Sequence, residues 1–213
     1  MNSLIPTQFG LKKIKLVGAG SYHSFAVHQD GRVYSWGLNS YGETGIAEHI
    51  GEGGESDVHH ATVVESLEGR GEVTHIEGGA HHSIAVTDSG ECLVWGRVDG
   101  FQLGLDIDAL PQDEIIKDSA NHPRILTTPT QVPNINAHYA AAGSDHCVAV
   151  AKDGKSYAWG FSASYQTGLG TDDDVKLATH IDNTATRGKK LVWAGCGGQF
   201  SVLAGIAEMS NGA

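Results

Sequence analysis

The chain has 213 residues, enough for one domain or two small ones with a hydrophobic core. Its 25 acidic residues outnumber 14 Lys and Arg, for a formal net charge of −11. Nucleic-acid binding neutralises phosphates with Lys and Arg, so this charge disfavours a direct nucleic-acid binder and suits a basic protein partner. No apolar run approaches the roughly 18 residues of a membrane span, so no membrane partner is expected.

The three cysteines, Cys92, Cys147 and Cys196, lie far apart in the sequence and form no CxxC pair. An odd number of cysteines without an apolar signal-peptide core predicts reduced thiols in an intracellular protein. Glycine is abundant, with 29 residues against 5 prolines. It recurs at fixed places, which indicates turns and close backbone approaches of a repeated unit.

The first predicted strand is 14–17, and a β-hairpin follows at 20–37 with the sequence GSYHSFAVHQDGRVYSWG. In its first half, larger and smaller side chains alternate with the two-residue period of a half-buried strand. Asp30-Gly31 supplies the backbone angles of a tight turn, and the return strand is rich in β-branched and aromatic residues. Residues 1–16 are expected to end a preceding unit, because Ile5-Pro6-Thr7 matches a proline-led strand start later in the chain.

This hairpin sequence occurs three times without gaps. The second copy, at 79–96, is GAHHSIAVTDSGECLVWG, and the third, at 143–160, is GSDHCVAVAKDGKSYAWG. In each copy the His precedes the Trp by thirteen positions, and a fourth copy starts at Gly197. The copies divide the chain into the segments 1–16, 17–71, 72–136, 137–187 and 188–213. Internal repeats of this regularity indicate a repeat architecture.

Each unit is predicted to contain four short strands. Fourth strands are expected at 61–67, 125–132 and 177–181. The last unit supplies strands at 191–194 and 200–205 and a frayed end at 208–213. Two connections are longer: a Gly- and acid-rich loop at 43–60 and a surface insertion at 106–121 with at most one helical turn.

Four antiparallel strands repeating every 54 to 64 positions predict an all-β fold, a β-propeller of four-stranded blades. One blade cannot bury both faces, so the blades must pack around an axis. Closed propellers have about four to eight blades, and this chain supplies about three and a half. We therefore expect an incomplete propeller, either a fragment, a truncated gene product or half of a split propeller.

The pattern Gly-x-x-His-Ser, Ala-Val, Asp-Gly and Trp-Gly resembles the regulator of chromosome condensation repeat across nearly the whole chain. Residues 140–205 are similar to the C-terminal blades of the family's nuclear exchange factors, most of all the fungal forms. The resemblance implies a seven-bladed propeller in the nucleus. It implies a guanine-nucleotide exchange factor that binds a Ran-type small GTPase and stabilises its nucleotide-free state, so that GDP leaves. It further implies association of the full protein with chromatin through histones, with no cofactor and no covalent chemistry.

Two features depart from what the resemblance implies. The wedge that opens the nucleotide site lies in an earlier blade than those present here, so this chain alone is expected to exchange nucleotide poorly. The fourth copy has Phe200 where the pattern has His, and in the family that His contributes to GTPase binding. An alternative hypothesis remains open: a repeat propeller that serves as a protein-interaction adaptor and does not act on Ran.

Candidate binding residues occupy the position just before the repeated His, and we call them the bend residues. They vary among the copies, as expected where a fixed scaffold carries a binding face. Of these, His81 and Asp145 best match family residues that affect exchange, and Asp145 could pair with a partner's Lys or Arg. The predicted GTPase-binding set is Tyr22, His81, Asp145, Gln199 and Phe200.

The invariant residues of the copies favour a structural role. A His in every unit is expected to hydrogen-bond backbone of the next strand and hold blade to blade, although a ring of GTPase contacts is the alternative. A Trp in every return strand is expected in the core between blades, although a stacking platform for a base or peptide is the alternative. The predicted structural set is His23, His82, His146, Trp36, Trp95 and Trp159.

The sequence offers no strong metal site. His59-His60 and His81-His82 lack the cysteine or His spacing of zinc sites. Thr171 to Asp174 lacks the Gly and Glu of a calcium loop and is interpreted as a solvated acidic loop. We identify no nucleophile, triad or phosphate-binding pattern, so the prediction is a binding protein without an enzyme active site.

Overall fold

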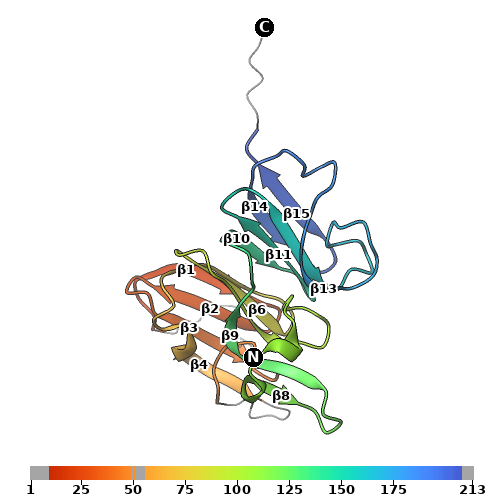
Figure 1. Cartoon of the computed structure of the whole chain (residues 1–213). Helices are drawn as coiled ribbons and strands as arrows, with labels where there is room; N and C mark the ends of the chain where they lie inside the picture. Colours follow the sequence, from red (N-terminus) through yellow and green to blue (C-terminus); the bar gives the residue numbers. More distant parts are fainter. Residues whose placement is uncertain (1–9, 49, 51–55, 208–213) are drawn as a thin grey trace, which may run out of the picture.

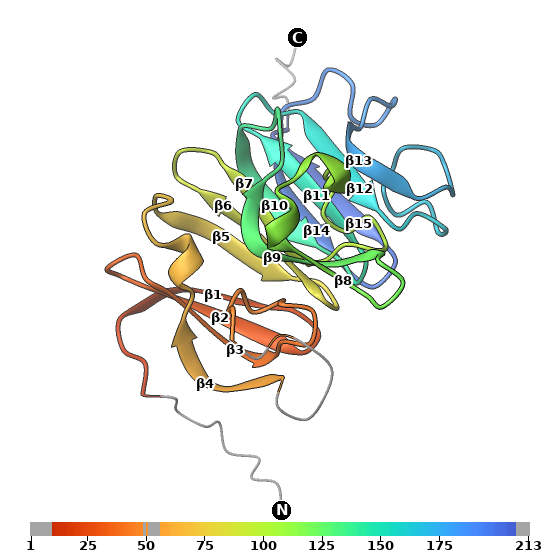
Figure 2. The same ribbon diagram turned by 60° about the horizontal axis from the view of Figure 1, so that its bottom comes forward.

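The computed structural model describes residues 10–48, 50 and 56–207. Their strands form four antiparallel sheets that follow one another in chain order (Figures 1 and 2). The first sheet contains β1 (Ile14–Ala19), β2 (His23–His28), β3 (Val33–Leu38) and β4 (Asp57–Val63). The second contains β5 (Val73–Gly78), β6 (His82–Thr87), β7 (Cys92–Arg97), β9 (Pro123–Gln131) and β8 (Ile115–Lys117). The third contains β10 (Ala137–Ala142), β11 (His146–Ala151), β12 (Ser156–Gly160) and β13 (Val175–His180), and the fourth contains β14 (Leu191–Cys196) and β15 (Ser201–Gly205).

The first strand of each sheet contacts the first strand of the next. Contacts join β1 to β5, β5 to β10 and β10 to β14. The other strands extend away from this line in sequence order, except that β9 lies between β7 and β8 in the second sheet. Inner strands gathered along one axis, with sheets radiating from it, are the geometry of a β-propeller. The all-β propeller prediction is confirmed. The described residues form three complete blades and the first two strands of a fourth, so the propeller is incomplete.

Burial of the strands differs from the alternation expected of half-buried strands. Every residue of β6 and of β11 is buried. These strands belong to the two middle blades, which have a neighbouring blade on both faces, so both sets of side chains enter a core. By contrast, β1 in the first blade and β15 in the last retain exposed residues along one face, because the described residues cover only one side of each.

The hairpin of the first blade has the predicted turn. His23 pairs with Gly37 and Val27 with Val33 across β2 and β3. Gly31, at φ +94°, donates its N–H to the carbonyl of His28 at 3.0 Å. This left-handed conformation is unstrained only for glycine, which explains the Asp-Gly sequence at the turn.

The fourth strand of the first blade differs from its predicted range of 61–67. It begins earlier, at Asp57, because Val58 turns into the core and is 6% exposed. It ends at Val63, and Glu65–Leu67 form a 3₁₀ turn that brings Leu67 into the core. The predicted loop at 43–60 is therefore shorter than expected, since its last residues belong to β4.

The insertion at 106–121 is more structured than the surface loop that we predicted. It contains two 3₁₀ turns, Ile107–Ala109 and Gln112–Glu114, and then strand β8, which pairs with β9 as a fifth strand. Ile115 is 7% exposed and packs in the core, whereas its neighbour Ile116 points outward. The outer edge of this blade is thereby covered.

The remaining differences are shifts of strand ends. Strand β13 starts and ends slightly before the predicted 177–181, and β1 starts at Ile14, so the boundary between 1–16 and 17–71 falls inside this strand. The predictions for Ile5-Pro6-Thr7 and for 208–213 concern residues outside the described part of the chain. Within the described residues, no helix is long and apolar enough to cross a membrane.

Candidate functional site: the bends at one end of the blades

The four repeated glycines before the bend residues gather at one end of the axis. Gly20, Gly79, Gly143 and Gly197 line one open cavity of about 310 Å³. Main-chain hydrogen bonds of 2.9 Å join neighbouring bends, with Ser21 N donating to the Gly79 carbonyl and Ala80 N to the Ser144 carbonyl. The four bends therefore share one end of the propeller and form a continuous surface.

In the three complete hairpins, the backbone of the bend residue is held by the Trp-Gly step of the same hairpin. The residue after that glycine donates its N–H to the carbonyl of the bend residue, at 2.8 to 2.9 Å, in the pairs Leu38–Tyr22, Arg97–His81 and Phe161–Asp145. Each glycine has positive φ, +106° at Gly96, and a Cβ there would lie 2.7 Å from the His81 carbonyl oxygen. Glycine is required for this close approach. The repeat thus fixes the bend backbone while the side chain varies.

The repeated histidines connect each blade to the next. Nε2 of His23 lies 2.8 Å from Ser83 Oγ, Nε2 of His82 lies 3.2 Å from Cys147 Sγ, and Nε2 of His146 lies 2.9 Å from Ser201 Oγ. Each of these Nε2 partners is a side chain of the following blade, whereas we predicted backbone. The partner is the residue immediately after the repeated His position of the next blade, which holds His82, His146 and Phe200 in turn, so the register of the repeat sets the pairing.

Burial keeps these histidines neutral. It lowers the pKa of His23 to about 4 and that of His82 to about 3, and it also lowers the pKa of His146. A charged imidazole would lose its hydration in this interior, which is the physical cause of all three shifts. A neutral His donates from only one ring nitrogen, so each blade junction contains one oriented hydrogen bond.

Two of the three repeated tryptophans are fully buried between blades. Trp95 Nε1 donates to the Glu43 carbonyl at 3.1 Å, and Trp159 Nε1 donates to the Gln102 carbonyl at 2.8 Å. Trp36 is only half-buried and packs against the hydrophobic core between the first and second blades. Its blade is the first described, so no described blade lies on the side that the other two tryptophans face.

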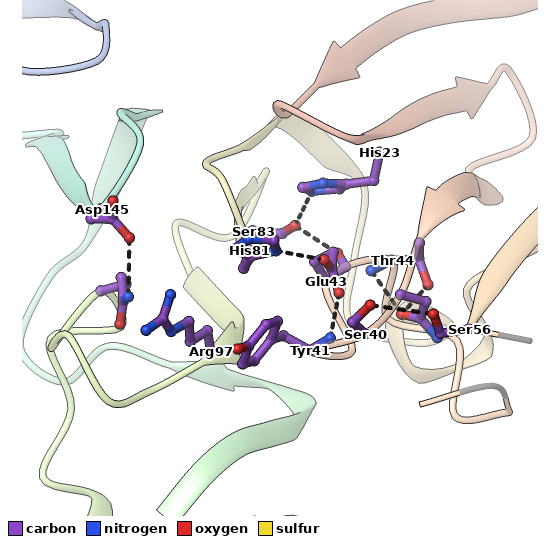
Figure 3. Close-up of polar contacts among 12 residues, drawn as sticks. His23, Ser40, Tyr41, Glu43, Thr44, Ser56, His81, Ser83, Arg97 and Asp145 are labelled. Carbon is purple, nitrogen blue, oxygen red and sulfur yellow. Dashed lines mark hydrogen bonds and ion pairs between the residues drawn. The ribbon is translucent and has the colours of Figure 1, made fainter. Parts of the chain in front are cut away.

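His81 lies in a cluster of aromatic and charged side chains (Figure 3). Its Nδ1 is 3.1 Å from Oε1 of the buried Glu43. Its ring stacks on Tyr22 at 5.6 Å and contacts the tilted ring of Tyr41 at 4.8 Å. The side chain remains 23% exposed, so it is held on three sides and still open to a partner.

Asp145 is held in a similar way one blade further on. Gln102 Nε2 donates to its Oδ1 at 3.3 Å, and the second carboxylate oxygen has no such restraint among the described contacts. Gln199 is exposed, and its Oε1 accepts a hydrogen bond of 3.2 Å from Ser164 Oγ. Tyr22 is 60% exposed. The structure places all four bend residues on the same end of the propeller.

Phe200 occupies the repeated His position of the fourth blade, and it is 61% exposed. A Cβ built on Gly197 would meet the Phe200 ring, just as a Cβ on Gly143 would meet the His146 ring. The Phe side chain therefore has the orientation of the histidines but no nitrogen to donate. It stands on the blade face that no described blade covers, with Val202 also exposed there.

Our sequence analysis missed Glu43, which touches His81 directly. Its carboxylate also accepts the Tyr41 N–H at 2.7 Å, and burial raises its pKa. Arg97 and Arg124 were missed as well; both guanidinium groups lie over the Tyr41 ring, at 5.2 and 5.9 Å. The available signal was the alignment of Glu43 with Gln102, in which an acid replaces an amide at a repeated position.

The described residues contain no group of three side chains that could hold a metal ion. His81 and His82 face different partners, Glu43 and Cys147. In the acidic loop, Asp174 Oδ1 accepts the Ser162 N–H at 3.1 Å, which ties the loop to its own blade. The arrangement of the bends suits recognition of another macromolecule by polar and aromatic contacts.

A propeller of Gly-x-x-His and Trp-Gly hairpins, with variable bends at one end, defines a class of repeat proteins that bind partners through loops. The RCC1-like domain matches residues 1–203, and this chain belongs to that family. This confirms the family that the repeat pattern indicated.

The chain is 42% identical to the protein pim1 of Schizosaccharomyces pombe, over 99% of this chain and 39% of pim1. It is 37% identical to the guanine nucleotide exchange factor SRM1 of Saccharomyces cerevisiae, over 97% of this chain and 42% of SRM1. The crystal structure of Prp20p from Saccharomyces cerevisiae, reported with its binding properties to Gsp1p and histones, matches with a TM-score of 0.89 and 36% identity. That match covers 98% of this chain and 47% of Prp20p, so the chain spans less than half the length of these relatives.

Proposed function

We propose that this chain is part of a guanine-nucleotide exchange factor for a Ran-type small GTPase, and that the bend surface with His81 and Asp145 binds the GTPase. The observation that carries the proposal is the placement of these two side chains: both are partly exposed, at one end of the propeller, on a backbone fixed by the Trp-Gly steps. A family relative named as an exchange factor supports the activity.

The proposed mechanism requires no covalent chemistry. An exchange factor accelerates GDP release when it binds the nucleotide-free GTPase more tightly than the GDP-bound form, because only this difference shifts the equilibrium. Asp145 would contribute by pairing with a Lys or Arg of the GTPase. His81, in contact with the rings of Tyr22 and Tyr41, would contribute a ring nitrogen and part of an aromatic surface. Tyr22, Gln199 and Phe200 would lie at the margins of the same interface.

We also propose that the full protein is nuclear and associates with chromatin through histones. The net charge of −11 suits contact with basic proteins and disfavours direct contact with DNA. The structural relative Prp20p has been studied for histone binding, which supports the same partner class.

The test is capture of purified Ran on the immobilised chain, with and without EDTA to remove Mg²⁺ and release nucleotide. The expected result is stronger capture with EDTA, weakened by His81→Ala and by Asp145→Ala but not by His60→Ala on the outer strand β4. Equal capture by all variants would reject the bend surface as the binding site. No capture of Ran under either condition would favour the adaptor hypothesis over the exchange-factor one.

A further inference from the structure

One buried position recurs beneath the bends and was not assigned a role above. It is occupied by Glu43 in the first blade, Gln102 in the second and Gln166 in the third, each at most 4% exposed. In each blade one side-chain oxygen accepts the N–H of the residue two positions earlier, at 2.7 to 2.9 Å, from Tyr41, Gly100 and Ser164 respectively. This bond leaves one terminal atom of each side chain available for another partner.

The available atom points to the bend residue of the next blade, and its hydrogen-bonding character matches that residue. Glu43 offers a carboxylate oxygen, an acceptor, to Nδ1 of His81. Gln102 offers an amide N–H, a donor, to the carboxylate of Asp145. Exchanging the two buried residues would place a donor against a ring N–H and a carboxylate against a carboxylate.

In the third blade the buried residue and the bend residue of the next blade are not bonded to each other. Gln166 Nε2 is buried and has no hydrogen-bond partner among the described residues. The bend residue beyond it, Gln199, is exposed and is bonded to Ser164 instead. The side chain of Gln199 is therefore less restrained from below than those of His81 and Asp145.

Packing of the blades does not account for the acid at position 43. Apart from the His81 contact, this position bonds to the neighbouring blade through its main-chain carbonyl, which accepts from Trp95 Nε1 and Ser83 Oγ. Gln102 makes the same main-chain contact with Trp159. Glutamine has the same shape as glutamate, and a buried carboxylate costs more to desolvate than a buried amide. The glutamines of the other blades make the equivalent of the Tyr41 N–H bond as well, so this bond does not require an acid. What distinguishes Glu43 is its second oxygen, Oε1, which meets Nδ1 of His81.

We propose that Glu43 and Gln102 are positioning residues that determine which atom of the bend residue faces a binding partner. Glu43 holds the proton of His81 on Nδ1 and turns Nε2 outward, and Gln102 engages Oδ1 of Asp145 and leaves Oδ2 to accept from the partner. The outward atoms, Nε2 of His81 and Oδ2 of Asp145, are then both acceptors, which fit a partner rich in Lys, Arg and N–H donors. The part of this inference that concerns the partner rests on the proposed function.

The histidines of the same blades provide an internal contrast. Ser83 Oγ donates its only hydrogen to the Glu43 carbonyl at 2.7 Å, so it must accept from His23 Nε2–H. His23 is therefore the Nε2–H tautomer, whereas our proposal makes His81 carry its proton on Nδ1. His81, which contacts the Glu43 side chain, and His23, which contacts Ser83, are thus expected to have opposite tautomers.

The experiment is nitrogen NMR of the imidazole side chains of the full chain at neutral pH, which distinguishes the tautomers. We expect a protonated Nδ1 at His81 and a protonated Nε2 at His23. Glu43→Gln should change the His81 signals and leave those of His23 unchanged, which also shows that the variant is folded; the exposed Glu65→Gln serves as control. The proposal would be overturned if His81 of the parent chain carried its single proton on Nε2. It would also be overturned if Glu43→Gln left the His81 signals unchanged.

The partner side is tested by affinity for Ran prepared without nucleotide. Glu43→Gln should weaken binding by about tenfold, the effect of one lost oriented hydrogen bond. The double variant Glu43→Gln with His81→Asp, which copies the Gln102–Asp145 pair, should recover most of that loss. Loss of affinity without recovery would mean that Glu43 does not act by matching the bend residue. If the parent chain does not bind Ran at all, the proposed function fails, and the tautomer experiment still decides the positioning role.

Discussion

Lowering the pH from 7 to 5 should destabilise this protein through its buried histidines. The pKa of His23 falls from 6.5 to about 4 on folding, and that of His82 falls from 6.5 to about 3. Between these values the unfolded chain binds protons that the folded chain does not. Stability contributed by a depressed pKa is therefore present above about pH 6.5 and is lost as the pH falls toward the folded pKa.

The magnitude follows from the two shifts. At pH 5 an unfolded His is almost fully protonated, while His23 and His82 in the folded blades remain almost fully neutral. At about 1.36 kcal/mol for each pH unit below 6.5, each of these two histidines lowers the free energy of unfolding at pH 5 by about 2 kcal/mol. Together they lower it by about 4 kcal/mol. Since domains are stable by about 5–15 kcal/mol, this is a large share of the total. His146, with its pKa also lowered by burial, changes stability in the same direction.

The assay is denaturant unfolding at pH 7 and pH 5, comparing the parent with single variants. Burial raises the pKa of Glu43 and Glu77, which acts in the opposite direction, so the comparison between variants carries the test. The loss in free energy of unfolding between pH 7 and pH 5 should be about 2 kcal/mol smaller in His82→Gln than in the parent. His23→Gln serves as a second variant. His60→Gln, an exposed control, should leave the difference unchanged. If the free energy of unfolding changed equally between pH 7 and pH 5 in the parent and in both buried-His variants, these histidines would not be the cause of the pH dependence.

Three further predictions concern the repeat and the bend surface. Trp159→Phe should lower stability by about 1–2 kcal/mol in denaturant unfolding, because the Gln102 carbonyl loses the indole N–H and keeps only the weak Cys147 thiol as a donor; an unchanged midpoint would mean that the indole bond contributes nothing. Gly96→Ala should cost at least about 1 kcal/mol in the same assay, since φ is +106° and the added Cβ approaches the His81 carbonyl. In titration calorimetry, Asp145→Asn should weaken Ran binding more at low salt than at high salt, because it removes a charge. The same ratio of parent to variant affinity at both salt concentrations would argue against a charged contact.

The blades were predictable because their determinants are local in the repeat. Gly, His and Trp-Gly recur at fixed spacing, and each is needed where it occurs: glycine at positive φ, Trp between blades and His at the junction. The early start of β4 was not predictable, because one buried Val58 in a polar stretch gives no periodic signal. Strand β8 was missed for a related reason, since only Ile115 of its three residues is buried.

The candidate site was predictable in position but not in contacts. The bend residues were located from their variability among the copies, and the structure places them on one end of the propeller. Their restraints come from the preceding blade, about 40 residues away in the sequence, as between Glu43 and His81. No local pattern encodes such a pair. The same holds for His23 and Ser83, which the repeat relates only once the blades are packed.

The most direct test of the central claim is a comparison of the chain's affinity for nucleotide-free Ran and for GDP-bound Ran, by titration of the same preparation. We expect tighter binding of the nucleotide-free form, and a loss of that preference when His81 and Asp145 are both changed to Ala. Equal affinity for the two forms, or a preference that survives the double substitution, would show that the bend surface does not recognise the GTPase in the proposed way.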